Sequence, residues 1–336
     1  YGKNIGLKAS KSTVNTSLQF LLTDPYYTFD GVSRTTSATI SSTDVSATST
    51  ASYLSDTFAG GVMYNMPISE TATFGIGYDI SLTDFTTTIG SPIIVTHHIA
   101  DHGGTAFGVK FKTNYVTDTR NRTVFAETGL LTNLTGDLFI GVSGASHASI
   151  TLRTESNKGY VLKTFGFDWP TVFQLKTTVG VGAGLGSATS LPFYNKYFAG
   201  GNGTVRGYKG ASLGPLTYNA GRSQNTCAAK SIPGTYIKCD AIGGDFLTAA
   251  QFNWIFSPPS FLGEDTRALR TTLFVDVGNV FEKVNNFDYN ELRGSFGIEF
   301  NVLTPIGGVS VGFVQALNSK LGDDTQPVIF QLGGNF

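Results

Sequence analysis

The feature that most constrains the fold of this chain is a two-residue alternation of apolar side chains with small or polar ones. In the stretch ETATFGIGYDISL, the two kinds of side chain fall on opposite faces of an extended backbone. The apolar set is Ala72, Phe74, Ile76, Tyr78, Ile80 and Leu82, and the opposite set is Thr71, Thr73, Gly75, Gly77, Asp79 and Ser81. The same period returns in LKTTVGVGAGLG and TLFVDVGNV. This period is typical of β-strands, whose successive side chains point to opposite faces.

Polar or glycine-rich breaks divide the chain into about fourteen segments with strand character. These segments cover residues 3–10, 15–29, 32–43, 51–64, 70–84, 105–117, 126–140, 147–162, 170–185, 243–256, 267–282, 290–303, 308–317 and 327–336. No long segment keeps an apolar stripe at helical spacing between helix caps. We therefore predict an all-β fold without helices.

Composition bears on whether this β-protein lies in a membrane. Charged residues make up 14% of the chain, against roughly 25% in average soluble domains. The non-apolar faces carry Thr, Ser, Gly, Asn and Gln, which suits a wet lumen, and the apolar faces suit lipid. Strands cross a bilayer only as a closed or nearly closed barrel, because hydrocarbon offers their backbone groups no other partner. We predict a transmembrane antiparallel β-barrel, with a large soluble β-protein as the alternative.

The connections between these segments are of two kinds. Short breaks such as NMPISE and LTPIGG predict tight turns on one rim, and long polar segments around residues 84–104 and 199–242 predict extracellular loops on the other. The second long loop contains Cys227 and Cys239, the only two cysteines of the chain. In an oxidising compartment we expect a local disulfide between them, and the rival interpretation is a metal-binding pair.

The segment FYNKYFAGGNGTVRGYKGASLGP runs into the second long loop. It resembles the sixth extracellular loop of the superfamily of BamA, TamA and the two-partner-secretion transporters, most closely its BamA branch. The residues that match the hallmark V-R-G-F/Y are Val205, Arg206, Gly207 and Tyr208. The segment LFVDVGNVF, with Asp276 and Gly278, is similar to a strand near the end of the family barrel. The segment PVIFQLGGNF is similar to its final strand.

The resemblance implies a barrel of about sixteen strands, preceded by periplasmic POTRA domains. By this match Tyr1 falls near the third strand. We therefore expect residues 1–336 to be the C-terminal barrel domain, with the first two strands and all POTRA domains outside this sequence. The long loop is expected to fold back into the lumen.

Within the lumen, we expect the loop to be held by Arg206. The hinge glycines that would let the backbone turn are Gly200, Gly201 and Gly203. Asp276 is the best acceptor, because its parity places it opposite Val275 and Val277, on the inward face. A two-pronged Arg206–Asp276 pair would act as a latch. Where the family often has a lumen glutamate on the strand after the loop, this chain has Gln251, so an ionic partner is not expected there.

Inward glycines on other strands have two interpretations. They could leave space for the latched loop, or they could only relieve crowding and tune strand curvature. The residues in question are Gly75, Gly77, Gly180, Gly182, Gly184 and Gly186.

The resemblance implies an outer-membrane assembly factor of Gram-negative bacteria, which folds and inserts client β-barrel proteins through a weak seam between its first and last strands. Its implied partners are unfolded clients, the lipid bilayer, and, through the POTRA domains, accessory lipoproteins and periplasmic chaperones. The residues expected in the seam strand are Val328, Phe330, Leu332, Gly333, Gly334 and Phe336. The alternatives are a TamA-like or two-partner-secretion transporter and a passive porin.

Other chemistry has weaker support in the sequence. The net charge of −1 provides no basic field for nucleic acid. The segment GASLG at Gly210–Gly214 matches the nucleophile elbow of esterases, but a strand-to-helix corner and a placed histidine are not predicted around it. Residues His97, His98 and His102 with Asp101 could bind a metal but are more often solvated on a polar loop. We expect neither enzyme activity nor a cofactor.

Overall fold

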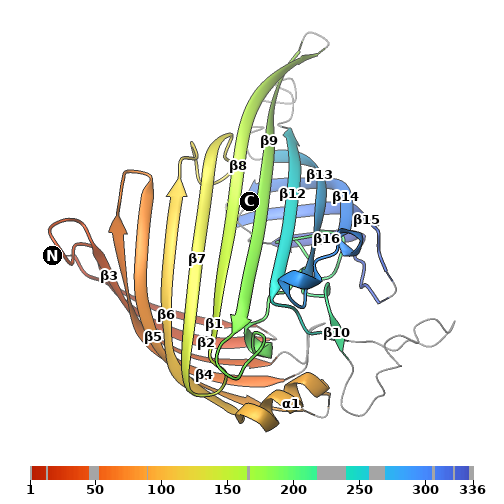
Figure 1. Ribbon diagram of the computed structural model, residues 1–336. Coiled ribbons are helices and arrows are strands. Elements are labelled where there is room, and N and C mark those ends of the chain that lie inside the picture. The colour runs from red at the N-terminus through yellow and green to blue at the C-terminus, as the bar shows by residue number, and fades with distance from the viewer. Residues whose placement is uncertain are drawn as a thin grey trace.

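The computed structural model describes residues 2–12, 14–44, 53–88, 90–164, 167–217, 240–256, 269–304, 307–320 and 322–332. Its main feature is one 14-stranded antiparallel sheet that curves into a barrel-like wall (Figure 1). The strands of this sheet are β1 (Asn4–Lys11), β2 (Asn15–Asp24), β3 (Ser33–Asp44), β4 (Leu54–Pro67), β5 (Ala72–Thr86), β6 (Thr105–Asp118), β7 (Thr128–Ser143), β8 (His147–Thr164), β9 (Phe167–Gly184), β12 (Phe246–Phe256), β13 (Leu269–Phe281), β14 (Arg293–Thr304), β15 (Gly307–Leu317) and β16 (Val328–Leu332).

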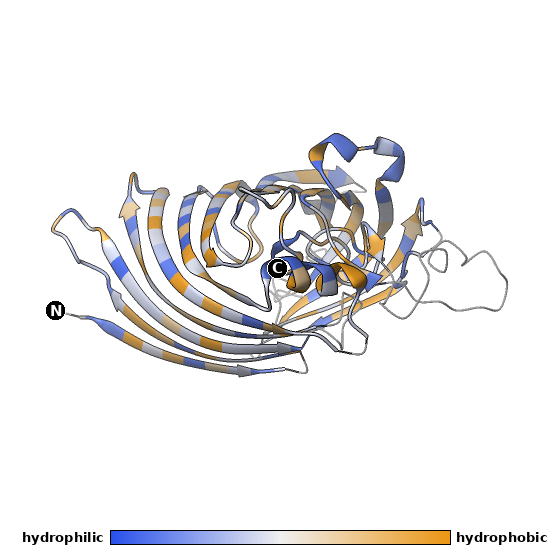
Figure 2. Ribbon diagram, turned by 60° about the horizontal axis from the view of Figure 1, so that its bottom comes forward, coloured by the Kyte–Doolittle hydropathy of each residue, from blue (hydrophilic) through white to orange (hydrophobic). Residues whose placement is uncertain are grey.

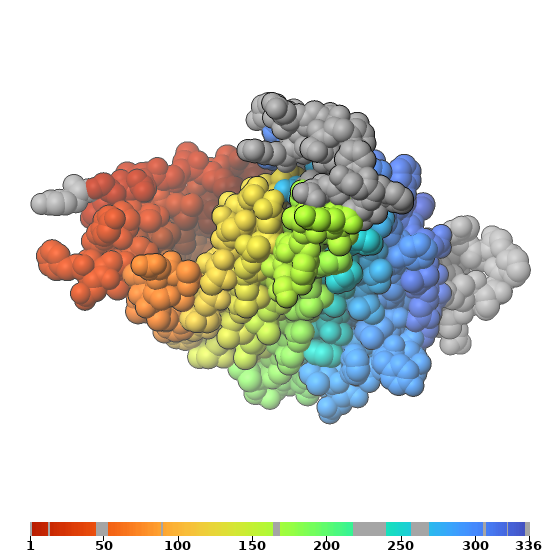
Figure 3. Space-filling model, turned by 90° about the horizontal axis from the view of Figure 1, so that it is seen from above, coloured from red at the N-terminus to blue at the C-terminus, as the bar shows by residue number. Residues whose placement is uncertain are grey.

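The strands follow one another around the wall in chain order, as the view from above shows (Figure 3). Two short strands, β10 (Leu216–Thr217) and β11 (Asp240–Ala241), form a separate ribbon in the connection from β9 to β12. In the described residues, β1 pairs only with β2 and β16 only with β15, so these two strands are the edges of the sheet. The fourteen predicted strand segments correspond one to one with the strands of the sheet.

Alternation along each strand produces the two faces of the wall. On β5, Ile76, Tyr78 and Ile80 are exposed on the outer face, while Gly75 and Gly77, which alternate with them, are buried. On β13, Leu273, Val275 and Val277 are likewise exposed, and Asp276 is fully buried. Figure 2 shows the resulting bands of hydrophobic and hydrophilic residues that alternate along the strands. The apolar rows therefore face outward, as expected for a lipid-exposed barrel, and the soluble alternative is wrong.

The expectation that the chain has no helix is wrong in the connection from β5 to β6. Residues Ile93–His102 form the helix α1, which begins after Pro92 and ends at Gly103, whose φ is +84°. The helix is held by packing: Val95 is fully buried in a cluster with Phe85 and other aromatic residues. A ten-residue helix stabilised by tertiary contacts gives little periodicity for a sequence pattern to detect.

Three short 3-10 helices complete the described structure: η2 (Phe193–Asn195), η6 (Val284–Asn286) and η7 (Tyr289–Glu291). None of the helices in the described residues is long and apolar enough to cross a bilayer.

The two long connections lie on the same rim, as expected. Because the strands are antiparallel, the connection from β5 to β6 and that from β9 to β12 leave the sheet at the same end, and α1 and β10 both lie at the lower rim in Figure 1. The adjoining ends of β4 and β5, and those of β14 and β15, lie at the opposite rim.

Candidate functional site: the loop held in the lumen

The connection from β9 to β12 folds back against the inner face of the wall. Tyr197 and Gly244 exchange two backbone hydrogen bonds of 2.9 Å, which tie the outgoing and returning arms of this loop together. The ring of Tyr197 occupies the space over Gly180, where an added Cβ would come within 2.6 Å of it. The side chain of Leu191 lies over Gly182 in the same way, at 2.3 Å. These two glycines make room for the loop.

The other inward glycines do not face this part of the loop. A Cβ at Gly75 or Gly77 would meet side chains or backbone of the adjacent strands β4 and β6. Gly184 lies against the backbone of residues 188–190, directly after its own strand. Gly186 lies in the turn after β9, with φ +69° and open space around it. Their small size therefore serves local strand packing and turning.

The turn that presents Arg206 depends on left-handed backbone at three glycines. The φ angles are +105° at Gly200, +83° at Gly201 and +84° at Gly207, a region that side chains strongly disfavour. At Gly200 a Cβ would also come within 2.4 Å of the Lys209 carbonyl oxygen. Gly203 is different, because no positive φ occurs there and a Cβ would meet no atom within 4 Å. The geometry therefore requires glycine at positions 200, 201 and 207 but not at 203.

Arg206 and Asp276 form a two-pronged pair inside the lumen. The Arg206 Nε donates to Asp276 Oδ2 at 2.8 Å, and its Nη2 donates to Oδ1 at 2.7 Å. The backbone N–H of Arg206 donates to the same Oδ2 at 2.9 Å. The Asp276 side chain is fully buried, and that of Arg206 is 7% exposed. The pair therefore fixes the orientation of the guanidinium as well as its distance from β13.

Three further groups complete the surroundings of the guanidinium. Its Nη1 donates to Glu299 Oε2 of β14 at 2.8 Å, and its Nη2 donates to Asn253 Oδ1 of β12 at 2.6 Å. The ring of Phe274 lies under it, 3.6 Å from the guanidinium carbon to the ring centroid. Four guanidinium N–H groups of Arg206 thus donate to side chains of the three neighbouring strands β12, β13 and β14. We call Arg206, Asp276, Glu299 and Asn253 the latch.

Gln251 contributes to the site through neutral hydrogen bonds. Its Nε2 donates to the backbone oxygen of Asn202 at 3.1 Å and lies 3.4 Å from Asp276 Oδ2. The ionic partner that the family pattern would place near this strand is supplied here by Glu299. On the other side, Asn253 Nδ2 donates to Gln174 of β9 at 3.0 Å. The latch therefore continues into a network of amide side chains along the lumen.

The flanking hallmark residues pack the loop onto the wall. Val205 and Tyr208 are buried in a cluster with residues of β12 and β13. The Tyr208 hydroxyl donates to the Leu317 carbonyl oxygen at 2.7 Å, and burial, followed by the charge of Asp323, raises the Tyr208 pKa to about 12. At Gly278 a Cβ would approach the Thr248 carbonyl oxygen within 2.6 Å. Gly278 therefore permits the close pairing of β12 and β13.

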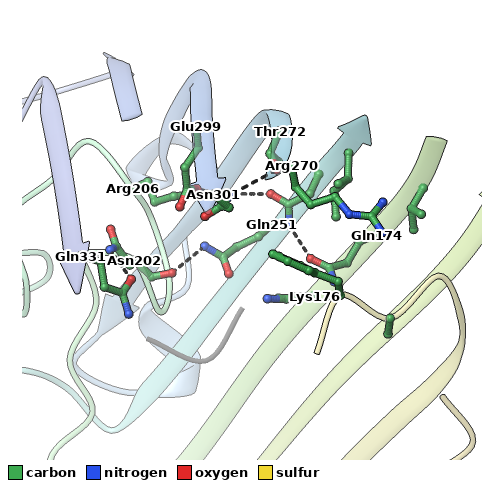
Figure 4. A pocket seen from close by; sticks show the side chains of 15 residues that line it. Gln174, Lys176, Asn202, Arg206, Gln251, Arg270, Thr272, Glu299, Asn301 and Gln331 are labelled. Atoms are coloured by element: carbon green, nitrogen blue, oxygen red, sulfur yellow. Dashed lines mark hydrogen bonds and ion pairs between the residues drawn. The ribbon is translucent and has the colours of Figure 1, made fainter. Parts of the chain in front are cut away.

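A polar cavity of about 110 Å³ adjoins the latch (Figure 4). Its lining includes the cationic side chains of Lys176, Arg206 and Arg270 and the carboxylate of Glu299. Amide side chains of the network and of the last strand also line it, together with a few apolar side chains. A polar space of this size can hold several water molecules beside the latch.

The remaining candidate residues do not join this site. Cys227 and Cys239 lie outside the described residues, as do Gly333, Gly334 and Phe336. The seam-strand residues Val328, Phe330 and Leu332 are exposed on the outer face. Within GASLG, the Ser212 hydroxyl donates to the Lys209 carbonyl oxygen at 2.6 Å.

The histidine group lies on α1, at the rim. His97 is exposed, and the rings of His98 and His102 stack with their centroids 4.7 Å apart. Burial, followed by the charge of His102, lowers the His98 pKa to about 4. Among the described residues, no group of three or more potential metal ligands occurs.

Glu299 is the partner that sequence reasoning missed. The signal was present: on β14 the outward positions are Phe296, Ile298 and Phe300, so Glu299 must point inward. Parity identified Asp276 on β13 in the same way. The sequence alone does not place β14 beside the tip of the loop, and this proximity selects Glu299 as the second carboxylate.

Comparisons with known proteins agree with this architecture. The Omp85 superfamily domain matches residues 1–336. The outer membrane protein assembly factor BamA of Neisseria meningitidis serogroup B is 27% identical over 372 aligned residues, which cover 100% of this chain and 43% of that protein. The chain thus spans less than half the length of this relative.

Two solved structures share the fold. BamA from Haemophilus ducreyi lacking POTRA domains 1–3 gives a TM-score of 0.82 at 22% identity, covering 98% of this chain and 64% of that one. CdiB from Acinetobacter baumannii gives a TM-score of 0.50 at 12% identity, covering 94% and 49%. The chain therefore belongs to the Omp85 superfamily, and it is a multi-pass β-barrel protein of the outer membrane.

Proposed function

We propose that residues 1–336 are the C-terminal barrel domain of an outer-membrane protein assembly factor, which folds and inserts client β-barrel proteins. The observation that carries this proposal is the long loop held inside the lumen by Arg206, in a chain that the Omp85 superfamily domain matches over its whole length. The name of the Neisseria relative, an outer membrane protein assembly factor, supports the same function.

The mechanism we propose is physical and needs no bond chemistry. A strand edge with unpaired backbone groups can accept a further strand, which is a recognised mode of peptide binding. In the described residues β16 pairs with β15 alone, so its other side offers such an edge. A client strand would add there first, and the client barrel would grow from that hydrogen-bonded template into the bilayer.

The latch would keep the loop in the lumen while the seam works. Buried, two-pronged pairing fixes the loop in one orientation, and Val205 and Tyr208 pack beside it. Loss of the guanidinium would leave Asp276 without its main partner and would release the loop. The partners of this function are unfolded clients and the lipid bilayer, with accessory lipoproteins and periplasmic chaperones reached through POTRA domains.

A reconstitution assay tests this function. The full-length protein in liposomes is given an unfolded client barrel, and folded client is measured for the wild type, for Arg206→Ala and for empty liposomes. We expect the wild type to accelerate folding and Arg206→Ala to lose most of the acceleration. Equal folding with and without the wild type would reject assembly. Conductance of the purified barrel tests the porin alternative, and secretion of a passenger protein tests the transporter alternative.

A further inference from the structure

The long loop also contacts the last strand of the sheet, at positions separate from the latch. β16 is five residues long, and β15 pairs with it only from Val309 to Phe313. By comparison, β14 and β15 pair from Gly294 to Thr304. Few backbone hydrogen bonds to β15 therefore hold β16. Contacts from the lumen consequently contribute a larger share of the interactions that position β16 than they do for a longer strand.

A side-chain contact joins the loop to the far part of β16. Asn202 Nδ2 donates to Gln331 Oε1 at 2.8 Å, and Figure 4 shows the two side chains directed toward each other. The backbone oxygen of Asn202 accepts from Gln251, which also lies beside Asp276. A continuous series of polar contacts thus runs from the latch to the last strand.

A backbone contact joins the loop to the segment that enters β16. Lys209 N–H donates to the Asp324 carbonyl at 2.8 Å, and Gln326 N–H donates to the Gly207 carbonyl at 2.8 Å. Tyr208 and Thr325 form an antiparallel bridge between these bonds. The residues of the V-R-G-Y hallmark therefore act in two directions: the Arg206 side chain binds β12, β13 and β14, and the backbone beside it pairs with the chain that leads into β16.

We propose, as a refinement of the assembly function above, that Asn202 and the backbone of residues 207–209 position the last strand. Together they hold the entry and the far part of β16 in register on β15, so that the latch and the seam form one mechanical unit. The two holds differ in strength. The backbone of residues 207–209 contributes two hydrogen bonds and a bridge, whereas Asn202 contributes a single side-chain bond from an exposed residue, so the Asn202–Gln331 bond is the one that water replaces first. Opening of the seam strand therefore begins at its Gln331 end.

Hydrogen–deuterium exchange of the full-length protein in lipid nanodiscs tests this inference. The variants are Asn202→Ala, Gln331→Ala and the double variant, with peptides that cover β16 as the readout. We expect each single variant to raise exchange in β16 by about 2- to 10-fold, the range that one hydrogen bond of ordinary strength provides. The double variant should equal either single variant, because all three lack the same bond. Gln315→Ala, an outward amide on β15, is the matched control and should leave β16 unchanged.

Two results would overturn the inference: unchanged exchange in β16 for both single variants, or single effects that add in the double variant. The exchange readout needs no client, so it is separate from the test of function. If the wild type fails to fold clients while the coupled exchange pattern holds, the assembly function fails and the positioning of β16 stands. If clients fold and the coupled exchange pattern is missing, the assembly function stands and the positioning of β16 by the loop fails.

Discussion

Removal of the Arg206 guanidinium should destabilise the barrel strongly. Arg206→Ala deletes the side-chain hydrogen bonds to Asp276, Glu299 and Asn253, and leaves a fully buried carboxylate with only backbone and amide donors. A single hydrogen bond to a charged group contributes about 1.5–3 kcal/mol, but adding this value for every bond of Arg206 would overestimate the loss, because the bonds share one guanidinium. Breaking a buried ion pair costs about 3–5 kcal/mol. We expect the lower end, about 3 kcal/mol, because the adjoining cavity of about 110 Å³, which Arg206 and Glu299 line, can deliver water to the site once the guanidinium is removed.

Urea unfolding of the protein in liposomes, followed by the mobility shift of folded barrels on cold gels, measures this effect. With a urea dependence of about 1–3 kcal/mol per molar, the midpoint should fall by about 1–3 M. Arg206→Lys should fall between the wild type and Arg206→Ala, because an ammonium keeps the charge but loses the fork. The control is Arg153→Ala on β8, whose side chain is exposed on the same face as Glu155. A midpoint for Arg206→Ala equal to that of Arg153→Ala would refute the reasoning.

Two further predictions concern the loop and the rim. Gly180→Ala should displace the Tyr197 ring, break the hydrogen bond between its hydroxyl and Thr151, and destabilise the barrel by about 1–3 kcal/mol in the same urea assay. The control Gly6→Ala, whose added Cβ would meet only an ordinary contact at 3.7 Å, should leave the midpoint unchanged. Equal midpoints for the two variants would contradict the space-making role of Gly180. Because burial and then the charge of His102 lower the pKa of His98 from its ordinary 6.5 to about 4, α1 packing should be full above about pH 6.5 and weaken as the pH falls toward 4. An NMR titration of the His98 ring with a midpoint near 6.5 would contradict this.

The alternation of apolar and polar residues along the sequence was sufficient to predict most of the fold. The alternation along β5 and β13 placed Ile76 outside and Asp276 inside, because a strand offers only two faces and lipid takes the apolar one. The sequence pattern did not predict helix α1, because the stability of this helix comes from packing against aromatic residues far away in sequence, including Phe193. The residues of the site were likewise predicted where local alternation decides and missed where distant strands meet. The two-residue alternation placed Asp276 in the lumen, but the choice of Glu299 and Asn253 depends on which strands lie beside the loop tip, a property of the curved arrangement of the wall.

Stability alone does not explain why the latch is built from polar and charged side chains. A hydrophobic cluster of the same size could hold the loop as firmly, because burying an ion pair costs much of what the pairing returns. An apolar contact, however, tolerates sliding, whereas the guanidinium donates hydrogen bonds to carboxylate oxygens of β13 and β14 and to an amide oxygen of β12 in a single geometry. The backbone at Gly207 next to it pairs with the segment entering β16, so an error in the loop would pass directly to the register of the last strand. Directional hydrogen bonds therefore serve here to position an edge strand that few ladder bonds hold.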